Sequence, residues 1–192
     1  MPPKAKFTKE EIVSAALEIV KCEGIDALTA RSLGSALGSS ARPVFTVFEN
    51  MDEVHCEVIN AAKKLYAKYE DEGMNGENAF KGSGTGYIRF ATEQPKLFQL
   101  LFMREKENVP ALNNVLFEVD DYSEKIINSV TSAFGFSRET SIEIYMHLWI
   151  YTHGIAVLIA TNVCRFTEDE ISYMLSEVCG SIVKKFREEG RK

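Results

Sequence analysis

Three histidines are the side chains best suited to acid–base or metal chemistry in this sequence, but their spacing does not bring them together. His147 and His153 are six residues apart, on opposite sides of a helix, which argues against an i, i+4 metal pair. His55 stands alone. A Glu143–His147 pair on one helix face is more often a surface ion pair than a catalytic pair. No glycine-rich phosphate loop, nucleophile elbow or zinc motif occurs. We therefore expect no catalytic residue, metal or cofactor, and keep a small helical enzyme as a remote alternative.

The four cysteines are widely spaced and form no Cys-x-x-Cys pair. This spacing argues against a disulfide framework and against a clustered zinc site. Residues 1–9 hold no apolar signal region, and no uninterrupted apolar run approaches the roughly 18 to 20 residues that span a bilayer. We therefore expect a cytoplasmic protein with reduced thiols and no membrane partner.

Charge is distributed unevenly along the 192 residues, which carry a formal net charge of -6. Residues 1–50 hold six basic and six acidic side chains, so the whole deficit lies in residues 51–192. Hydrophobic residues at 45% and charged residues at 26% are typical of a folded globular chain. A neutral N-terminal segment can still bind nucleic acid when a few cations face the phosphates.

The first helical pattern has clear signals at both ends. Thr8 is a candidate N-cap, and Glu11, three residues later, completes a capping box. Phe7 and Ile12 are placed for a hydrophobic staple, and Gly24 supplies the stop. The sequence therefore predicts a helix between Thr8 and Gly24.

Two shorter helical patterns follow. One starts at Thr29 and stops at Gly38 after about two turns. The other covers residues 41–48, with Ser40 as its cap and Pro43 in the first turn, where a missing N–H is tolerated. Because isolated helices this short are marginal, both must pack on the first helix. The three together predict a helix-turn-helix.

The rest of the chain shows helical spacing without strand-like alternation. Several glycines around residues 73–86 are interpreted as helix breakers, so we place a linker there. Caps, prolines and apolar spacing predict helices over residues 50–72, 95–102, 110–134, 137–162 and 167–186. The predicted fold class is therefore all-α, with about nine helices.

A pattern of residues between positions 28 and 54 resembles the N-terminal signature of the tetracycline-repressor (TetR) family of bacterial regulators. The rest of the chain is similar to that family in length, helix count and the element Trp149-x-x-x-His153-Gly154. The matching residues are Leu28, Thr29, Arg31, Ser32, Leu33, Ala36, Leu37, Gly38, Ser40, Val44, Phe45, Phe48, Asn50, Asp52, Glu53 and Val54.

The resemblance implies a homodimer, a palindromic operator on double-stranded DNA and a ligand cavity in the C-terminal part, usually in a repressor. It predicts a helix-turn-helix DNA-binding domain over residues 1–50 and a helical ligand-sensing and dimerisation domain over residues 51–192. Two positions that contact phosphate in the family differ here. Phe45 stands where a tyrosine is frequent, and Met51 where a lysine is usual. We expect DNA binding to depend more on helix N-termini and on the basic tail.

A recognition helix places its first turn against the base edges of the major groove. Arg42 is the first candidate for base reading, because its planar guanidinium can bond guanine O6 and N7 together. Thr29 and Arg31 suit a phosphate at the start of the second helix, and Lys4, Lys6 and Lys9 form the basic tail. A solvated charge at Arg42, a plain cap at Thr29 and a solvated tail remain alternatives. The predicted DNA-binding residues are Lys6, Thr29, Arg31, Ser39, Ser40, Arg42, Pro43, Phe45 and Thr46.

Aromatic side chains are concentrated after residue 50, where all seven tyrosines and nine of the twelve phenylalanines lie. They predict an apolar pocket for a small hydrophobic or aromatic ligand that releases the operator. The alternatives are a plain aromatic core, control by a protein partner, or no effector. The predicted ligand-binding residues are Phe90, Phe98, Phe102, Phe117, Tyr122, Tyr145, Met146, Trp149 and His153.

The helix predicted over residues 137–162 is apolar nearly all round, so it needs partners on two faces. The last helix adds an apolar stripe. Two copies of each would form an isologous four-helix contact. The predicted dimer residues are Ala156, Ala160, Ile171, Leu175, Val178 and Ile182.

Overall fold

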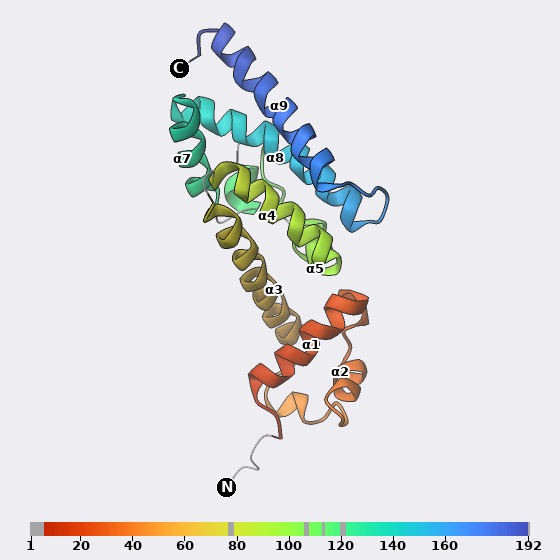
Figure 1. The fold of residues 1–192 in the computed structure, drawn as a ribbon. Helices are drawn as coiled ribbons and strands as arrows, with labels where there is room; N and C mark the ends of the chain where they lie inside the picture. Colours follow the sequence, from red (N-terminus) through yellow and green to blue (C-terminus); the bar gives the residue numbers. More distant parts are fainter. Residues whose placement is uncertain (1–5, 77–78, 106–107, 113, 120–121, 192) are drawn as a thin grey trace. The chain divides into compact units, whose positions relative to one another are not determined.

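The computed structural model describes residues 6–76, 79–105, 108–112, 114–119 and 122–191. These residues form nine α-helices, two short 3-10 helices and no strand, which confirms the predicted all-α class (Figure 1). The elements are α1 (Lys9–Glu23), η1 (Ile25–Ala27), α2 (Ala30–Ala36), η2 (Val44–Thr46), α3 (Met51–Met74), α4 (Ala79–Glu93), α5 (Pro95–Phe102), α6 (Val115–Val119), α7 (Ser123–Phe134), α8 (Arg138–Ala160) and α9 (Glu168–Glu188).

The chain divides into two compact units. The first contains the residues up to Ala67 together with Gln94–Arg104, and the second contains Lys68–Glu93 and the residues from Glu105 onward. Helix α3 therefore contributes residues to both units. The first unit extends beyond the predicted domain of residues 1–50, because the first part of α3 and all of α5 belong to it.

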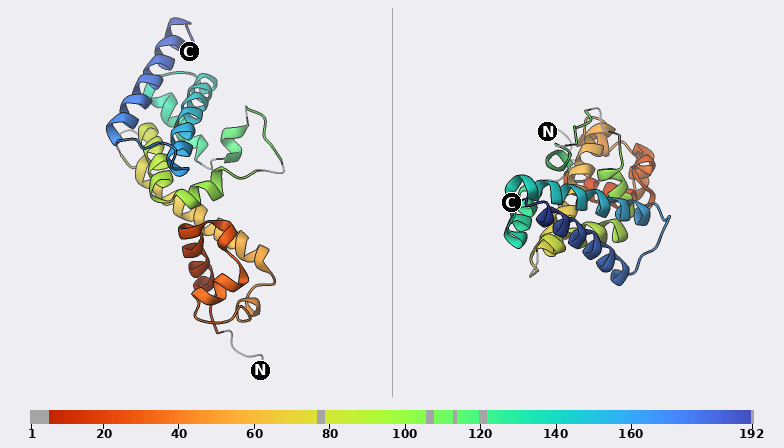
Figure 2. Two further views of the ribbon diagram at one scale, coloured as in Figure 1. Left: turned by 90° about the vertical axis from the view of Figure 1, so that its right-hand side faces the viewer. Right: turned by 90° about the horizontal axis from the view of Figure 1, so that it is seen from above.

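Helix α1 is the element on which the first unit is built. Thr8 caps it in the predicted capping box with Glu11, and the helix ends before Gly24, whose φ is 91°. Helix α1 contacts η1, α2 and α5 (Figure 2). The seven-residue α2 is thus held by packing more than by its own helical propensity. The buried apolar residues of this unit include Ile12, Ala16, Val20, Leu28, Leu33, Val44, Phe48, Val54, Val58 and Ala62.

Helix α8 is the central helix of the second unit. It lies between α4 and α9 and also contacts α7 (Figures 1 and 2). Ser137 caps its start, Gly135 ends α7 in the left-handed conformation, and Thr167 caps α9 in a capping box with Glu170. The core of this unit includes Leu116, Ile126, Ile127, Val130, Ile144, Tyr145, Leu148, Val183 and Phe186.

The glycine-rich stretch does not form the linker that we predicted. Helix α3 continues to Met74, and α4 runs through Gly82, Gly84 and Gly86. A Cβ on Gly82 would collide with the carbonyl oxygen of Gly73, and a Cβ on Gly86 would lie 2.5 Å from the carbonyl oxygen of Tyr69. Gly82 and Gly86 therefore allow α3 and α4 to pack backbone against backbone. The interpretation of the α4 glycines as helix breakers is wrong, whereas Gly76 does follow the end of α3 at Met74.

The single helix predicted over residues 110–134 is two helices, α6 and α7. The hydroxyl of Ser123 donates a hydrogen bond to the carbonyl of Leu116 at 2.5 Å. Such a side-chain bond to the backbone competes with continuation of the helix. It accounts for the start of a new helix at Ser123.

One helix among the described residues, α8, is long and apolar enough to cross a membrane by length and composition alone. Our expectation considered only uninterrupted apolar runs and missed this helix. The core helix of a folded domain passes the same test, and α8 packs on three helices of its own unit.

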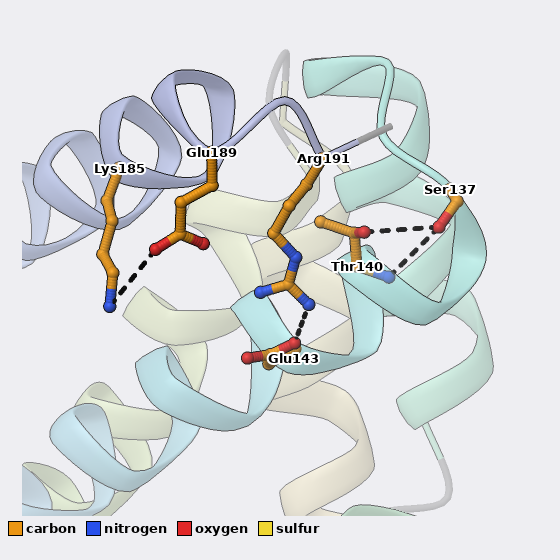
Figure 3. A network of polar contacts seen from close by, with 6 residues as sticks. All are labelled: Ser137, Thr140, Glu143, Lys185, Glu189 and Arg191. Carbon is orange, nitrogen blue, oxygen red and sulfur yellow. Dashed lines mark hydrogen bonds and ion pairs between the residues drawn. The ribbon is translucent and has the colours of Figure 1, made fainter.

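The end of the described chain is tied back to α8 (Figure 3). Gly190, with a φ of 69°, turns the chain after α9. Arg191 then forms an ion pair with Glu143 of α8, and its guanidinium lies 4.0 Å from the centre of the Phe186 ring. The Arg191 hydrogen bond holds the pKa of Glu143 below its usual range.

Candidate functional site

The turn after α2 is a helix C-cap with a defined backbone geometry. The N–H of Ser39 donates to the carbonyl of Gly34 at 2.9 Å, and the N–H of Gly38 donates to the carbonyl of Ser35 at 3.0 Å. With Gly38 at a φ of 60°, these two bonds form a Schellman motif. A Cβ on Gly34 would lie 2.7 Å from the backbone nitrogen of Ala41. The chain therefore returns directly over α2, and only glycine fits at position 34.

The segment after this turn is shorter than the predicted recognition helix. Only Val44–Thr46 is helical, as a single 3-10 turn. Pro43 has no N–H to donate, and the Thr46 hydroxyl donates to the Pro43 carbonyl at 2.7 Å, which favours a tight turn. The prediction of an α-helix over residues 41–48 is therefore wrong. Val44 and Phe48 are nevertheless buried, while Phe45 is 42% exposed, so the segment is anchored at two points.

All the predicted DNA-binding residues lie in the first unit, and none of them is buried. Arg31, Arg42 and Thr46 are exposed. Thr29 caps α2 in a capping box with Ser32, so its role as a cap is confirmed. Its contact with phosphate stays a prediction.

The N-terminal arm reaches the turn through one of its lysines. The Lys6 ammonium donates to the Ser39 hydroxyl at 3.1 Å, which brings together two predicted DNA-binding residues. Lys9 instead pairs with Glu57 of α3 at 2.9 Å, and this hydrogen bond raises the pKa of Lys9. The expectation that Lys9 belongs to a basic tail is therefore wrong, and Lys4 lies outside the described residues.

A polar cluster in the second unit joins α4 to α8. The hydroxyl of Tyr87 and Nδ1 of His153 lie 2.9 Å apart, within hydrogen-bond distance. The His153 ring stacks on Trp149, with centroids 5.2 Å apart and planes inclined by 15°. Burial lowers the pKa of His153, so its imidazole is neutral at neutral pH. The indole Nε1 of Trp149 is buried, and no described residue accepts a hydrogen bond from it.

A second polar contact in this unit, between α3 and α4, was not predicted from the sequence. Glu70 is fully buried, and its Oε2 accepts a hydrogen bond of 2.7 Å from the Ser83 hydroxyl. Glu70 lies four residues after Tyr66 and four before Met74, both of which are buried. An acid on the apolar stripe of a helix was the available signal.

The predicted ligand-binding residues are divided between the two units. Phe98 and Phe102 lie in the first, where the Phe102 ring contacts Phe98 and Tyr66, each at 5.1 Å. The other seven lie in the second. A groove of about 340 Å³ between α1 and α3 is lined by none of the nine. In the second unit Phe90 and Tyr145 are buried, Phe117 is exposed, and Tyr122, Met146, Trp149 and His153 are half-buried.

Two of the predicted dimer residues are placed differently from our expectation. Ala156 and Ala160 are buried within the chain itself. The outward face of α8 is formed instead by Ile150, which is 48% exposed, by Gly154 and by Leu158, which is 38% exposed. On α9 the predicted residues Ile171, Leu175, Val178 and Ile182 are half-buried.

Among the described residues no group of three or more His, Cys, Asp or Glu side chains is placed to hold a metal ion. No family model matches the chain. The chain is 23% identical over 176 residues to the uncharacterized HTH-type transcriptional regulator YobS of Bacillus subtilis (strain 168), an alignment that covers 88% of this chain and 87% of that protein.

Proposed function

We propose that this chain is a DNA-binding transcriptional regulator of the helix-turn-helix type. The observation that carries the proposal is the turn after α2, where the Schellman motif at Gly38 and the close approach at Gly34 hold the next segment against α2. That segment is anchored by Val44 and Phe48 and leaves Arg42 exposed. A fixed segment with an exposed arginine is what base reading in a major groove requires.

The similarity to a protein named as an HTH-type transcriptional regulator supports this proposal, because the alignment extends over most of both chains. We further propose a regulator of the TetR type that represses transcription from a palindromic operator. The matching residues between positions 28 and 54 support that assignment. This function places the protein in the cytoplasm, where it meets chromosomal DNA.

We propose that α8 and α9 form the contact of a homodimer. The outward face of α8 carries Ile150 and Leu158 on either side of Gly154, where a Cβ would meet no atom within 4 Å. Exposed apolar side chains beside a glycine suit a close helix–helix contact. Ile150→Glu should dissociate the dimer in sedimentation, whereas Leu112→Glu, at a residue 62% exposed outside these helices, should not. A stable monomer of the unmodified protein at micromolar concentration would contradict this proposal.

We also propose that the second unit senses a small hydrophobic or aromatic molecule that releases the DNA. Helix α3 supports this role, because it begins in the first unit and ends in the second. A ligand that weakens DNA binding tenfold needs about 1.4 kcal/mol of preference between the two states of the protein. A packed second unit that takes no small molecule would favour control by a protein partner.

Selection of duplexes from a random library by the full chain tests the DNA-binding proposal. We expect enriched sequences with two related half-sites. In fluorescence anisotropy, Arg42→Ala should weaken binding to the selected duplex by about 1 to 3 kcal/mol and change binding to unrelated duplex much less. Arg104→Ala, which removes another exposed arginine of the first unit, is the matched control. Equal losses on both duplexes would contradict base reading by Arg42.

A further inference from the structure

Trp149 is the one tryptophan of the chain, and its indole N–H is a hydrogen-bond donor. Its Nε1 is buried and has no hydrogen-bond partner among the residues that the structure describes. Buried indole N–H groups usually find a partner, because a buried donor left unsatisfied keeps its desolvation penalty. Each such group in a folded protein calls for an explanation, and a bound acceptor is one.

The side chains around this N–H are aromatic and suit an aromatic ligand. The indole is stacked on the His153 imidazole, and Tyr87 of α4 holds that imidazole through Nδ1. Trp149 and His153 are each only half-buried, although Nε1 itself is covered. Flat rings favour offset stacking or edge contacts with such a surface.

Two charged groups on the neighbouring helices already have an opposite charge beside them. On α4, Arg89 forms an ion pair with Glu72 and lies over the Tyr69 ring. On α8, Glu143 forms an ion pair with Arg191. Burying a charged ligand group beside a neutral indole and imidazole would be unfavourable, because a buried charge needs its own counter-charge.

We propose that the effector of this protein is an uncharged aromatic molecule with a hydrogen-bond acceptor, such as a ring carbonyl, which accepts from the Trp149 indole N–H. Its ring contacts the Trp149–His153 stack. This inference rests on the proposed function, in which the second unit senses a small molecule. It adds the chemical class of that molecule and the atom that recognises it.

Three flat probes of similar size test the acceptor and the charge separately in the unmodified protein. Coumarin has a ring carbonyl, naphthalene has no acceptor, and 2-naphthoate has a negative charge. Because the chain has one tryptophan, its ¹⁵N-labelled protein gives a single indole N–H resonance, which reports on Trp149 without assignment. We expect coumarin to shift this resonance saturably and to bind more tightly than either other probe.

A variant then tests the hydrogen bond itself. In Trp149→Phe, which keeps an aromatic ring and removes the N–H, the coumarin affinity measured by equilibrium dialysis should fall about tenfold, whereas that of naphthalene should not change. Tyr173→Phe is the control, because it removes a polar group from an aromatic residue that is 67% exposed on α9. Thermal melts establish that the variants are folded, and the comparison of probes needs no variant.

The outcomes separate this inference from the proposed function. Absence of binding by all three probes, equal binding of coumarin and naphthalene, preference for 2-naphthoate, or an unchanged coumarin affinity in folded Trp149→Phe would each overturn the inference. DNA binding is measured independently on the selected duplex. If DNA binding persists while the probe results are negative, only the effector class is wrong. If no duplex is selected, the proposed function itself fails.

Discussion

The two units of the molecule keep their polar side chains in different places. Among the described residues the buried polar or charged side chains are Glu70, Ser83, Ser123, Thr140, Ser141 and Thr152. All six lie in the second unit, and none lies in the first. The first unit therefore has a mostly apolar interior, in which the buried hydroxyl of Tyr66 is an exception, whereas the second has polar contacts within its core.

This difference matches two kinds of recognition. A surface that binds DNA needs exposed cations and donors on a fixed backbone, which the first unit provides with Arg31 and Arg42. A site for a small molecule needs a mostly apolar enclosure with a few polar groups that fix orientation. In the second unit, Tyr87, His153 and Trp149 carry polar groups that could fix the orientation of such a molecule. We interpret the second unit as the more specifically packed of the two.

The largest effect is expected where α3 and α4 meet through their backbones. Gly82→Ala should lower the free energy of unfolding by about 3 kcal/mol or more, because its Cβ would collide with the carbonyl of Gly73 and two helices must separate. Gly84→Ala is a control on the same helix, since its Cβ would meet no atom within 4 Å. It should stabilise the protein by about 0.5 to 1 kcal/mol. Urea denaturation followed by circular dichroism measures both, and equal effects would break the comparison.

The buried contact between Ser83 and Glu70 should give the next largest effect. Ser83→Ala removes the donor to a fully buried carboxylate and should cost about 1 to 3 kcal/mol of unfolding free energy. Thr85→Ala, two residues further along α4 and exposed, should change stability by less than about 0.5 kcal/mol. The same denaturation series tests the pair. A Ser83→Ala protein as stable as the unmodified one would show that the polar core of the second unit adds no stability here.

The titration of His153 predicts that the protein loses stability at acidic pH. Burial lowers its folded-state pKa, so as the pH falls below the unfolded value of about 6.5 the unfolded chain binds a proton before the native protein does. Stability should therefore decline from about pH 6.5 downward until the lower folded pKa is reached. Thermal melts of His153→Gln should show a weaker decline, while His147→Gln, at an exposed histidine, should match the unmodified protein. An identical decline in all three proteins would exclude His153 as its cause.

The smallest effect is expected at the surface ion pair between Arg191 and Glu143. Both side chains are about a third exposed, so Arg191→Ala should lower the free energy of unfolding only slightly. The pKa of Glu143 is lowered by this contact, so the contribution is present near neutral pH and is lost as the pH falls through that lowered pKa. Chemical denaturation at neutral and acidic pH checks both statements. A loss as large as that in Gly82→Ala would reverse the proposed order.

Local signals explain what the sequence could predict. Thr8, Thr29 and Thr167 were predicted as helix starts from local residues, and in the structure each forms a capping box with the residue three positions later. They identified the starts of α1, α2 and α9. The Pro95 start and the Gly135 stop were equally local.

Contacts between distant residues explain what the sequence could not predict. Tyr87 and His153 are 66 residues apart, and nothing in their local pattern pairs them. The glycines of α4 suggested a linker because single-segment propensity cannot show that α3 approaches them. The segment of residues 41–48 was predicted as an α-helix because its apolar spacing, with Val44 and Phe48 buried, fits a helix and a 3-10 turn equally well.

A hydroxyl-radical footprint on the selected duplex tests the central claim that the first unit reads DNA as half of a symmetric pair. We predict two protected half-sites related by a two-fold axis, with centres roughly one helical turn or a little more apart. At the lowest protein concentration that saturates the unmodified complex, Arg42→Ala should weaken this protection, whereas Arg104→Ala should preserve it. A single protected patch without two-fold symmetry, or the same footprint from Arg42→Ala as from the unmodified protein, would contradict the account.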